Sequence, residues 1–158
     1  MKVYRIERKK YLSTTLKGVG ASRTEGYRWN SLNTYLIYTA STRALATLEV
    51  SVHLDLSEDL PTDRYYVEID IPDDIGILEI EVADLPNDWN SKPPISLTQF
   101  IGDEFMNSNE FAVLQVPSSI VPPERNFLIN PKHKDASKIK VISKVLMKFD
   151  ERMKPKSK

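Results

Sequence analysis

The chain has 158 residues, 41% of them hydrophobic and 28% charged, and it contains no cysteine. This length and composition predict one globular domain that buries roughly 70% of the surface its unfolded chain would expose, and the lack of cysteine excludes disulfides, thiolate metal sites and a cysteine nucleophile. The net charge is zero, which disfavours a globally basic protein that binds nucleic acid directly.

The zero net charge is the sum of three blocks of opposite sign. Residues 1–54 carry nine Lys/Arg against three Asp/Glu (+6), residues 55–110 carry fifteen Asp/Glu against two Lys/Arg (−13), and residues 111–158 carry eleven Lys/Arg against four Asp/Glu (+7). Either basic block can present positive potential to a phosphate. The acidic block is expected to form a solvated outer face, with a docking surface for a basic partner as the alternative.

The N-terminal third is predicted to contain two strands separated by a long loop, and then a helix. Residues 2–8 alternate apolar and charged side chains and are predicted to form a short strand near a sheet edge. Residues 10–26 are rich in Thr, Ser and Gly, which is typical of a long functional or mobile loop. Residues 35–39 are β-prone, and Ser41 or Thr42 can cap a helix that runs to about residue 54.

The later elements are predicted from alternation, apolar runs and prolines: strands at 64–71, 77–82, 111–116 and 139–149, a helix that Ser96 caps and that reaches residue 107, and a loop through 122–131. No repeat or linker divides the chain, so residues 1–150 are assigned to a single compact domain. Its predicted class is α+β (mixed α/β), with short strands and a few helices. Residues 151–158 form a basic tail that is expected to fray.

No membrane, export or metal function is predicted. The first ten residues carry charges without an apolar core, so they do not form a signal peptide, and no apolar stretch approaches the length of a membrane span. The chain is therefore expected to be cytoplasmic. His53 and His133 lie far apart with no acidic motif between them, so surface or capping roles are expected for both.

Glu49 is the residue of the predicted helix that fits an ordinary surface helix least well. Leu45, Leu48 and Val52 mark an apolar stripe, and Glu49 falls inside it, four residues after Leu45 and three before Val52. A carboxylate on a buried face is costly unless it is paired or faces a binding site. The pattern therefore indicates a functional carboxylate, a structural ion pair, or an apolar face of the helix that differs from the predicted one.

Arg28 stands between two aromatic residues in the segment GYRWN, residues 26–30, directly after the long loop. A guanidinium beside aromatic rings is suited to holding a phosphate while a base or a pyridine stacks on the rings. The alternative is a surface arginine next to core aromatics, and the residues taken alone favour that alternative.

A pair of hydroxyls, Ser118 and Ser119, follows the predicted strand at 111–116. Hydroxyls at a strand end commonly cap turns, and no Gly-x-Ser-x-Gly elbow surrounds this pair, which disfavours a serine nucleophile. A hydrogen bond to a ligand is the more plausible functional role. Asn126 either joins the serine in that role or braces the loop.

Six segments resemble, in chain order, those of the RES-domain family: YRI (4–6), GYRWN (26–30), IYT (37–39), LEVSVHL (48–54), VPSSIVP (116–122) and NFLINP (126–131). The resemblance spans nearly the whole chain and makes residues 1–150 a RES domain. It implies a compact fold similar to that of ADP-ribosyltransferase toxins. The Arg, Glu and Ser that name the family map onto Arg28, Glu49 and Ser118, and Ser119 is the neighbour that would serve if the register slips. The family's tyrosine maps onto Tyr38 and its asparagine onto Asn126.

The resemblance implies a toxin that degrades NAD⁺ by phosphorolysis or hydrolysis of the nicotinamide–ribose bond. NAD⁺ is then the substrate and inorganic phosphate or water the acceptor, with no cofactor and no metal. Cleavage of this kind passes through an oxocarbenium-like ribose, whose charge Glu49 would stabilise. Arg28 would hold the pyrophosphate or the ribose, and Tyr38 would stack on nicotinamide. Ser118 and Asn126 would hydrogen-bond to ribose or phosphate.

Two other functions stay open: a toxin that transfers ADP-ribose to a protein, and a non-catalytic binding module of the same fold. The resemblance also implies partners. The expected partner is a cognate helix-turn-helix antitoxin that blocks the site, as in type II toxin–antitoxin systems. A homodimer within a larger toxin–antitoxin complex is the expected assembly.

Overall fold

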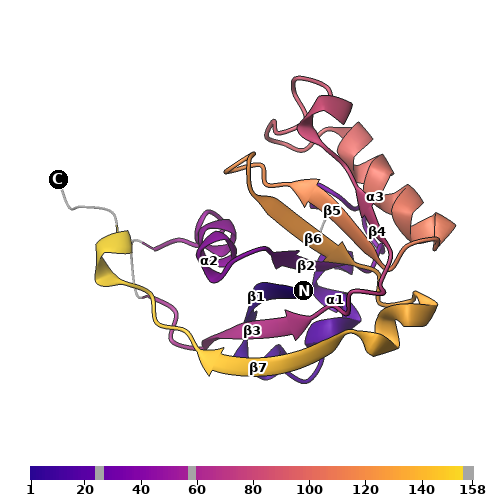
Figure 1. The fold of residues 1–158 in the computed structure, drawn as a ribbon. Coiled ribbons are helices and arrows are strands. Elements are labelled where there is room, and N and C mark those ends of the chain that lie inside the picture. The colour runs from indigo at the N-terminus through magenta and orange to yellow at the C-terminus, as the bar shows by residue number, and fades with distance from the viewer. Residues whose placement is uncertain (24–26, 57–59, 155–158) are drawn as a thin grey trace.

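The computed structural model describes residues 1–23, 27–56 and 60–154. A seven-stranded sheet crosses the molecule in the order β4-β5-β6-β2-β1-β3-β7 (Figure 1). Neighbouring strands pair antiparallel, except that β4 and β5 are parallel. The strands are β1 (Lys2–Arg8), β2 (Ile37–Ala40), β3 (Arg64–Asp70), β4 (Ile77–Glu79), β5 (Val113–Pro117), β6 (Arg125–Ile129) and β7 (Lys140–Leu146). The predicted α+β class is confirmed.

Three α-helices and five short 3-10 helices connect the strands in the described part of the chain. The α-helices are α1 (Val19–Ser22), α2 (Arg43–Ser51) and α3 (Ser96–Ser108), and the 3-10 helices are Lys9–Tyr11, Thr15–Lys17, Val82–Asp84, Lys134–Lys138 and Glu151–Met153. Thr42 caps α2, since its hydroxyl accepts a hydrogen bond from the Leu45 amide at 3.0 Å. Ser96 is the first residue of α3 and does not cap it. None of the described helices has the length and apolar character needed to cross a membrane.

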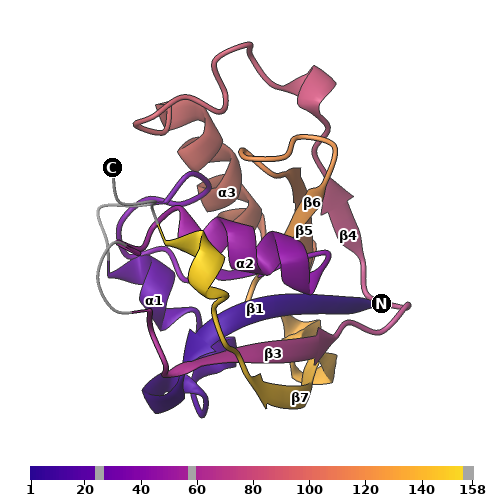
Figure 2. The same cartoon turned by 90° about the vertical axis from the view of Figure 1, so that its left-hand side faces the viewer.

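Helices α2 and α3 pack on the same face of the sheet. Residues paired across neighbouring strands point to the same face, and Ala40 of β2 pairs with both Tyr4 of β1 and Asn126 of β6. Tyr38, two residues before Ala40, shares that face. Helix α2 contacts β1 and β2, as Figure 2 shows where α2 lies across β1. Helix α3 contributes Phe105 to an apolar cluster with residues of β5 and β6. The side chains on this face of the central strands therefore lie between α2 and α3.

The opposite face of the sheet carries the largest apolar core. Its buried members come from five strands and the loops that follow them: Val3, Ile37, Val67, Ile69, Ile71, Ile75, Ala112, Val113, Phe127, Ile129 and Ile139. Leu12 and Leu16 pack against this core from the N-terminal loop. Each large apolar side chain that is fully buried contributes about 1.5–3 kcal/mol. This core thus stabilises the sheet, whose other face carries α2 and α3.

Strand β1 lies inside the sheet between β2 and β3, so the prediction of a strand near an edge was wrong. Its charged residues were the reason for that prediction. They are accommodated in the interior because they are paired: Arg5 Nη2 lies 2.9 Å from Glu7 Oε2, and Lys2 Nζ lies 3.0 Å from Glu68 Oε1. The edges of the sheet are β4 and β7.

Strand β6 occupies the middle of the sheet, where the sequence predicted only a loop through 122–131. Phe127, Leu128 and Ile129 are buried within it. The prolines that indicated a loop stand on either side of the strand, at 122, 123 and 131, where they remove no hydrogen bond of the ladder. The described part of the predicted long loop also has local structure, in the form of Lys9–Tyr11, Thr15–Lys17 and α1.

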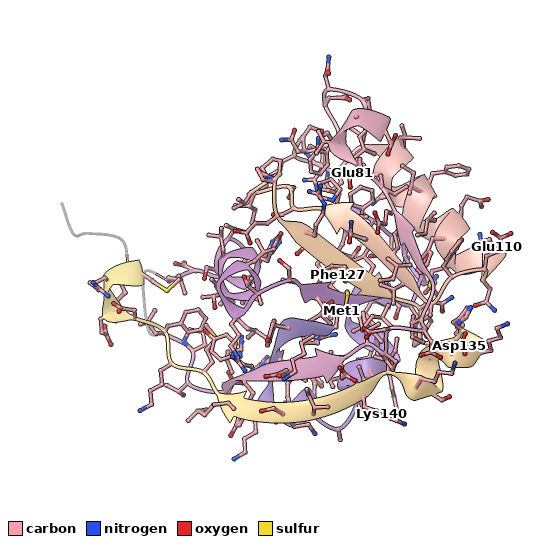
Figure 3. The ribbon with its side chains drawn as sticks, in the orientation of Figure 1. Met1, Glu81, Glu110, Phe127, Asp135 and Lys140 are labelled. Carbon is pink, nitrogen blue, oxygen red and sulfur yellow. The ribbon has the colours of Figure 1, made fainter. Side chains whose placement is uncertain are left out.

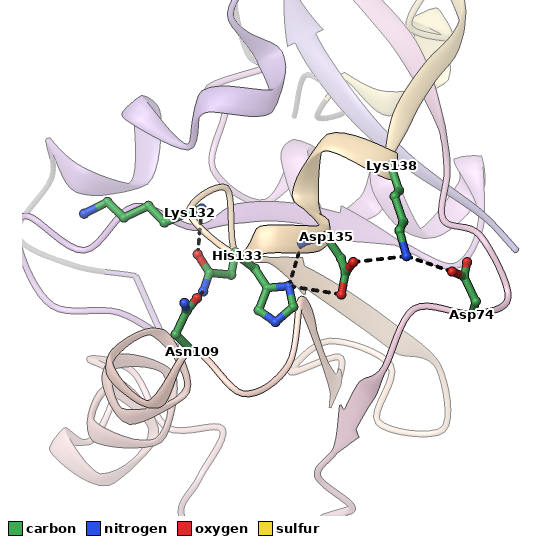
Figure 4. A network of polar contacts seen from close by, with 7 residues as sticks. Asp74, Asn109, Lys132, His133, Asp135 and Lys138 are labelled. Carbon is green, nitrogen blue, oxygen red and sulfur yellow. Dashed lines mark hydrogen bonds and ion pairs between the residues drawn. The ribbon is translucent and has the colours of Figure 1, made fainter.

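A polar network holds the connection between β6 and β7 (Figure 4). His133 is buried, and its Nδ1 accepts a hydrogen bond from the Asp135 amide at 3.1 Å, so it caps the 3-10 helix Lys134–Lys138. Lys138 Nζ lies 3.0 Å from Asp135 Oδ1 and 2.8 Å from Asp74 Oδ2. The capping role predicted for His133 is confirmed, while the exposed His53 lies on the surface.

Ion pairs at the surface join the acidic block to both basic blocks, as Arg8 with Asp63 and Arg125 with Glu81 show. Figure 3 shows Glu81 and Glu110 on the side of the molecule that carries β4 and α3, away from Lys140 at the start of β7. All three side chains are exposed. Of the tail predicted to fray, residues 155–158 lie outside the described residues, whereas Glu151–Met153 form a 3-10 helix and Met153 packs against the apolar cluster that includes Leu45.

Gly102 is required where α3 meets the segment before β2. A Cβ built on Gly102 would lie 1.7 Å from the Trp29 carbonyl oxygen, so Gly102→Ala forces the helix away from a backbone group that cannot yield. We expect the free energy of unfolding to fall by about 1–3 kcal/mol, measured by urea denaturation. Gly20→Ala is the control, since no atom lies within 4 Å of the added Cβ. Equal stability of the two variants would contradict the packing described here.

Candidate active site

The Glu49 carboxylate on α2 is held by two side chains from the sheet. Its Oε1 accepts hydrogen bonds from Ser118 Oγ at 2.9 Å and from Asn126 Nδ2 at 2.6 Å. Glu49 lies at the border of the buried face of α2, not within it: Leu45 and Ala46 are buried, but Val52 is 45% exposed. The predicted stripe was therefore wrong at Val52, while the carboxylate still has buried partners, as its position required.

Ser118 is fully buried and its hydroxyl is saturated. Besides donating to Glu49, Ser118 Oγ accepts hydrogen bonds from the Ile120 and Val121 amides, each at 3.1 Å. It therefore acts as a turn cap and orients the Glu49 carboxylate. The hydrogen bonds of the described residues include none from the Ser119 hydroxyl, so Ser118 is the serine that the fold places at this site.

Asn126 at the start of β6 is the second donor to Glu49. Because a carboxylate only accepts hydrogen bonds, this contact fixes which end of the Asn126 amide carries the nitrogen. Asn126 Oδ1 is buried, and among the described residues it has no hydrogen-bond partner. Both donors bind the same carboxylate oxygen, and of the described side chains none donates to Glu49 Oε2. The carboxylate is thus fixed through one oxygen.

The Arg28 guanidinium binds the backbone of residues 89–91. Its Nη1 donates to the Trp89 carbonyl at 2.6 Å and to the Ser91 carbonyl at 3.1 Å. Its Nη2 donates to the Ser91 carbonyl at 3.1 Å and to the Asn90 carbonyl at 3.3 Å. The guanidinium also lies 5.9 Å from the centre of the Trp89 ring. Arg28 therefore ties the segment that precedes α3 to the segment that precedes β2.

This contact corrects the expectation that the acidic block 55–110 lies apart as a solvated outer face. Trp89 is buried, packs with Trp29 at a ring separation of 6.3 Å, and brings the carbonyls of the block to Arg28. Strand β3 and Phe105 of the same block are also buried in the core. Carbonyl oxygens carry partial negative charge and suit a guanidinium, so the block contributes backbone, not carboxylates, to Arg28.

Arg28 lies within electrostatic reach of both Glu49 and Tyr38. Burial lowers the pKa of the Arg28 guanidinium, and the Glu49 carboxylate and the Tyr38 phenol act in the opposite direction. Burial likewise raises the pKa of the Tyr38 phenol, which keeps it neutral near pH 7. The site thus combines a fixed carboxylate and a fixed guanidinium with a neutral tyrosine.

Asn30 is a residue of this site to which the sequence assigned no role. Tyr38 Oη donates to Asn30 Oδ1 at 2.6 Å and accepts from the Trp29 amide at 3.3 Å. Asn30 is fully buried, and its Nδ2 donates to the carbonyls of Ala21 and Ser31. The only signal in the sequence is its place in the segment GYRWN. Asn30 holds the Tyr38 ring in one position.

All five side chains predicted for the site come together on the face of the sheet that carries α2 and α3. Glu49, Ser118 and Asn126 are in direct contact, and Arg28 and Tyr38 lie close enough to influence one another electrostatically. A fixed carboxylate is suited to stabilising a developing positive charge. Within the described ranges, no group of three or more His, Asp or Glu side chains is placed to hold a metal ion.

Known proteins with a similar sequence include several toxins. The family model described as RES domain matches residues 2–150. The chain is 43% identical over 146 residues to the Prs ADP-ribosylating toxin of Sphingobium sp. (strain YBL2), covering 90% of this chain and 89% of that protein. It is 38% identical to Toxin Res of Photorhabdus laumondii, covering 97% of each.

A solved structure shares the fold. The chain superposes on one from the crystal structure of the M. tuberculosis MbcT–MbcA toxin–antitoxin complex with a TM-score of 0.74, covering 92% of this chain and 83% of that one. The sequence identity is 18%, so this likeness concerns the fold. It confirms the compact α+β architecture expected from the sequence.

Removing the Ser118 hydroxyl leaves the Ile120 and Val121 amides without this partner and takes one of its two donors from Glu49 Oε1, which keeps the hydrogen bond from Asn126. We expect Ser118→Ala to lower the free energy of unfolding by about 1–3 kcal/mol, measured by urea denaturation at unchanged m-value. Ser119→Ala is the matched control and should stay within about 0.5 kcal/mol of the parent. The reverse ranking of the two variants would show that Ser119 occupies the position assigned to Ser118.

Proposed function

The chain belongs to the RES domain family, and on that premise we propose that it is the toxin of a toxin–antitoxin pair and cleaves the nicotinamide–ribose bond of NAD⁺. The observation that carries this proposal is the Glu49 carboxylate, which Ser118 and Asn126 fix through one oxygen. Growth arrest then follows from the loss of NAD⁺ or from modification of a protein.

The reaction breaks the bond between the anomeric carbon of the ribose and the nicotinamide nitrogen. The bonding electron pair leaves with nicotinamide and neutralises the positive charge of its ring, so no general acid is needed. The ribose carbon becomes oxocarbenium-like. Glu49 stabilises that charge, because a carboxylate already held in place needs no reorganisation when the charge appears. An acceptor oxygen then bonds to the same carbon and gives up its proton.

The remaining site residues position NAD⁺ in this proposal. Arg28 supplies positive charge for the pyrophosphate or the ribose, and the Tyr38 ring stacks on nicotinamide. The buried Oδ1 of Asn126 accepts a hydrogen bond from the ribose, and Ser118 orients Glu49. No cofactor or metal takes part: NAD⁺ is the substrate, and inorganic phosphate or water is the acceptor.

A second candidate is transfer of ADP-ribose to a protein. The printed name of the relative from Sphingobium, an ADP-ribosylating toxin at 43% identity, favours it. The bond that breaks and the role of Glu49 are the same in both reactions. The two candidates differ in the acceptor alone, which is a protein side chain in one and phosphate or water in the other.

The partner proposed for this chain is a cognate antitoxin. The toxin–antitoxin complex with the same fold supports a partner of this kind. We propose that the antitoxin is a helix-turn-helix protein, that the toxin forms a homodimer within the complex, and that it acts in the cytoplasm. Direct binding of nucleic acid by this chain is not part of the proposal.

Replacing Glu49 with Gln keeps the shape of the side chain and removes its charge. We expect Glu49→Gln to lower NAD⁺ consumption by roughly 10²–10³-fold and to abolish growth arrest when the chain is expressed alone. Cellular NAD⁺ and growth are measured at matched levels of soluble protein. Glu104→Gln, an exposed carboxylate on α3, should behave as the parent. Unchanged NAD⁺ consumption in Glu49→Gln would contradict the role proposed for Glu49, whereas a parent that binds a partner but consumes no NAD⁺ would favour a non-catalytic binding module.

The products identify the acceptor. We incubate the purified chain with labelled NAD⁺, with and without inorganic phosphate and with and without cell extract, and separate the products by mass. We expect free nicotinamide together with ADP-ribose-1″-phosphate or ADP-ribose, for phosphorolysis or hydrolysis. Label on a protein band with little free ADP-ribose would select the second candidate. Intact NAD⁺ under every condition would refute both.

A further inference from the structure

Tyr27 places a second aromatic ring beside the Tyr38 ring. The two ring centres are 5.4 Å apart and the rings are inclined at 57°. The Tyr27 side chain is 38% exposed, whereas Tyr38 is held among buried groups by Asn30 and Trp29. Together the rings form an aromatic corner, with Tyr38 as the inner wall and Tyr27 as the outer wall.

The backbone that carries Tyr27 is fixed from two sides. The Tyr27 carbonyl accepts a hydrogen bond from Gln99 Nε2 of α3 at 3.1 Å. Tyr27 also forms an isolated antiparallel bridge with Asn30. Its neighbour Arg28 is bound to the carbonyls of residues 89–91. An exposed ring on a fixed backbone loses little conformational freedom when a ligand packs on it.

Among the described residues, no cation stacks on the ring of Tyr27 or of Tyr38, although Arg28 lies within electrostatic reach of Tyr38. In the described part of the chain, the cation–ring contacts fall on Tyr4, Tyr11, Tyr35 and Trp89. Burial raises the pKa of the Tyr38 phenol, so the ring stays neutral at physiological pH. The corner therefore consists of two electron-rich tyrosine rings, the outer of them exposed, on which no cation of the described residues stacks.

We propose that Tyr27 is a specificity-determining residue that binds the positively charged nicotinamide ring of NAD⁺, with Tyr38 as the second wall. The proposal rests on the function proposed above and goes beyond it, since it assigns recognition of the ring charge to a residue outside the five predicted ones. A pyridinium is a flat cation, which tyrosine faces attract by both stacking and cation–π interaction. The dihydronicotinamide ring of NADH has the same outline without the charge.

The charge of the ring also determines which kinetic step Tyr27 affects. When the nicotinamide–ribose bond breaks, the electron pair neutralises the ring, so the attraction weakens on the way to the transition state. An interaction that is stronger in the ground state contributes to substrate binding and not to the rate of the chemical step. Tyr27 is therefore expected to act on KM and on discrimination against NADH, and the weakened attraction favours release of neutral nicotinamide.

The test compares Tyr27→Ala, Tyr27→Phe and the parent in steady-state NAD⁺ cleavage, with NADH as a competitive inhibitor. We expect Tyr27→Ala to raise KM for NAD⁺ by about three- to tenfold, with kcat equal to or above that of the parent and the inhibition constant of NADH changed by less than about twofold. Tyr27→Phe keeps the ring face and should resemble the parent. Tyr11→Ala, which removes a tyrosine that is 43% exposed outside the site, should also resemble it.

Three results would overturn the inference. An unchanged KM for NAD⁺ in Tyr27→Ala would show that the ring does not contact the substrate. Equal rises in KM for NAD⁺ and in the inhibition constant of NADH would show contact without recognition of charge. A fall in kcat together with a lower melting temperature would show that Tyr27 only supports Tyr38. Failure of the function proposed above is seen separately, as a parent protein that cleaves no NAD⁺.

Discussion

The hydrogen bonds to the Glu49 carboxylate connect two parts of the fold that are distant in sequence. Helix α2 packs on β1 and β2, whereas Ser118 and Asn126 stand at the end of β5 and the start of β6. A partly buried carboxylate is stable only with such donors, and in this chain both reach the same oxygen. The requirement to satisfy one charge thus fixes the helix against the centre of the sheet, and it leaves the other oxygen of the carboxylate without a donor among the described residues.

A second polar anchor works in the same way on the other side of the site. The two terminal nitrogens of Arg28 donate hydrogen bonds to the carbonyls of residues 89–91, and the rings of Trp29 and Trp89 pack next to that contact. The close approach of Gly102 to the Trp29 carbonyl allows α3 to sit against the same segment. Carboxylate, guanidinium and aromatic rings are therefore held by backbone and buried side chains, which is the preorganisation that electrostatic catalysis requires.

The exposure of each side chain in the proposed site separates residues that can contact a ligand from residues that position others. Ser118 and Asn30 are fully buried and bind other side chains, so they are suited to positioning Glu49 and Tyr38. Tyr27 is the more exposed of the two tyrosines. The residues that define the family by sequence are thus a mixture of groups suited to touching NAD⁺ and groups suited to holding others in place.

The sequence by itself determined the fold class, most strands and the Thr42 cap, and it named five side chains that the fold brings to one face of the sheet, because period-two alternation, capping hydroxyls and the family segments are local signals. It failed at β6, whose flanking prolines resemble those of a loop, and at β1, whose charges suggested an edge. Both depend on partners far along the chain: β6 pairs with β2 and β5, and β1 pairs with β3, whose Glu68 binds Lys2. Only the tertiary structure brought Trp89–Ser91 from the acidic block to Arg28, since a backbone carbonyl looks the same in every sequence.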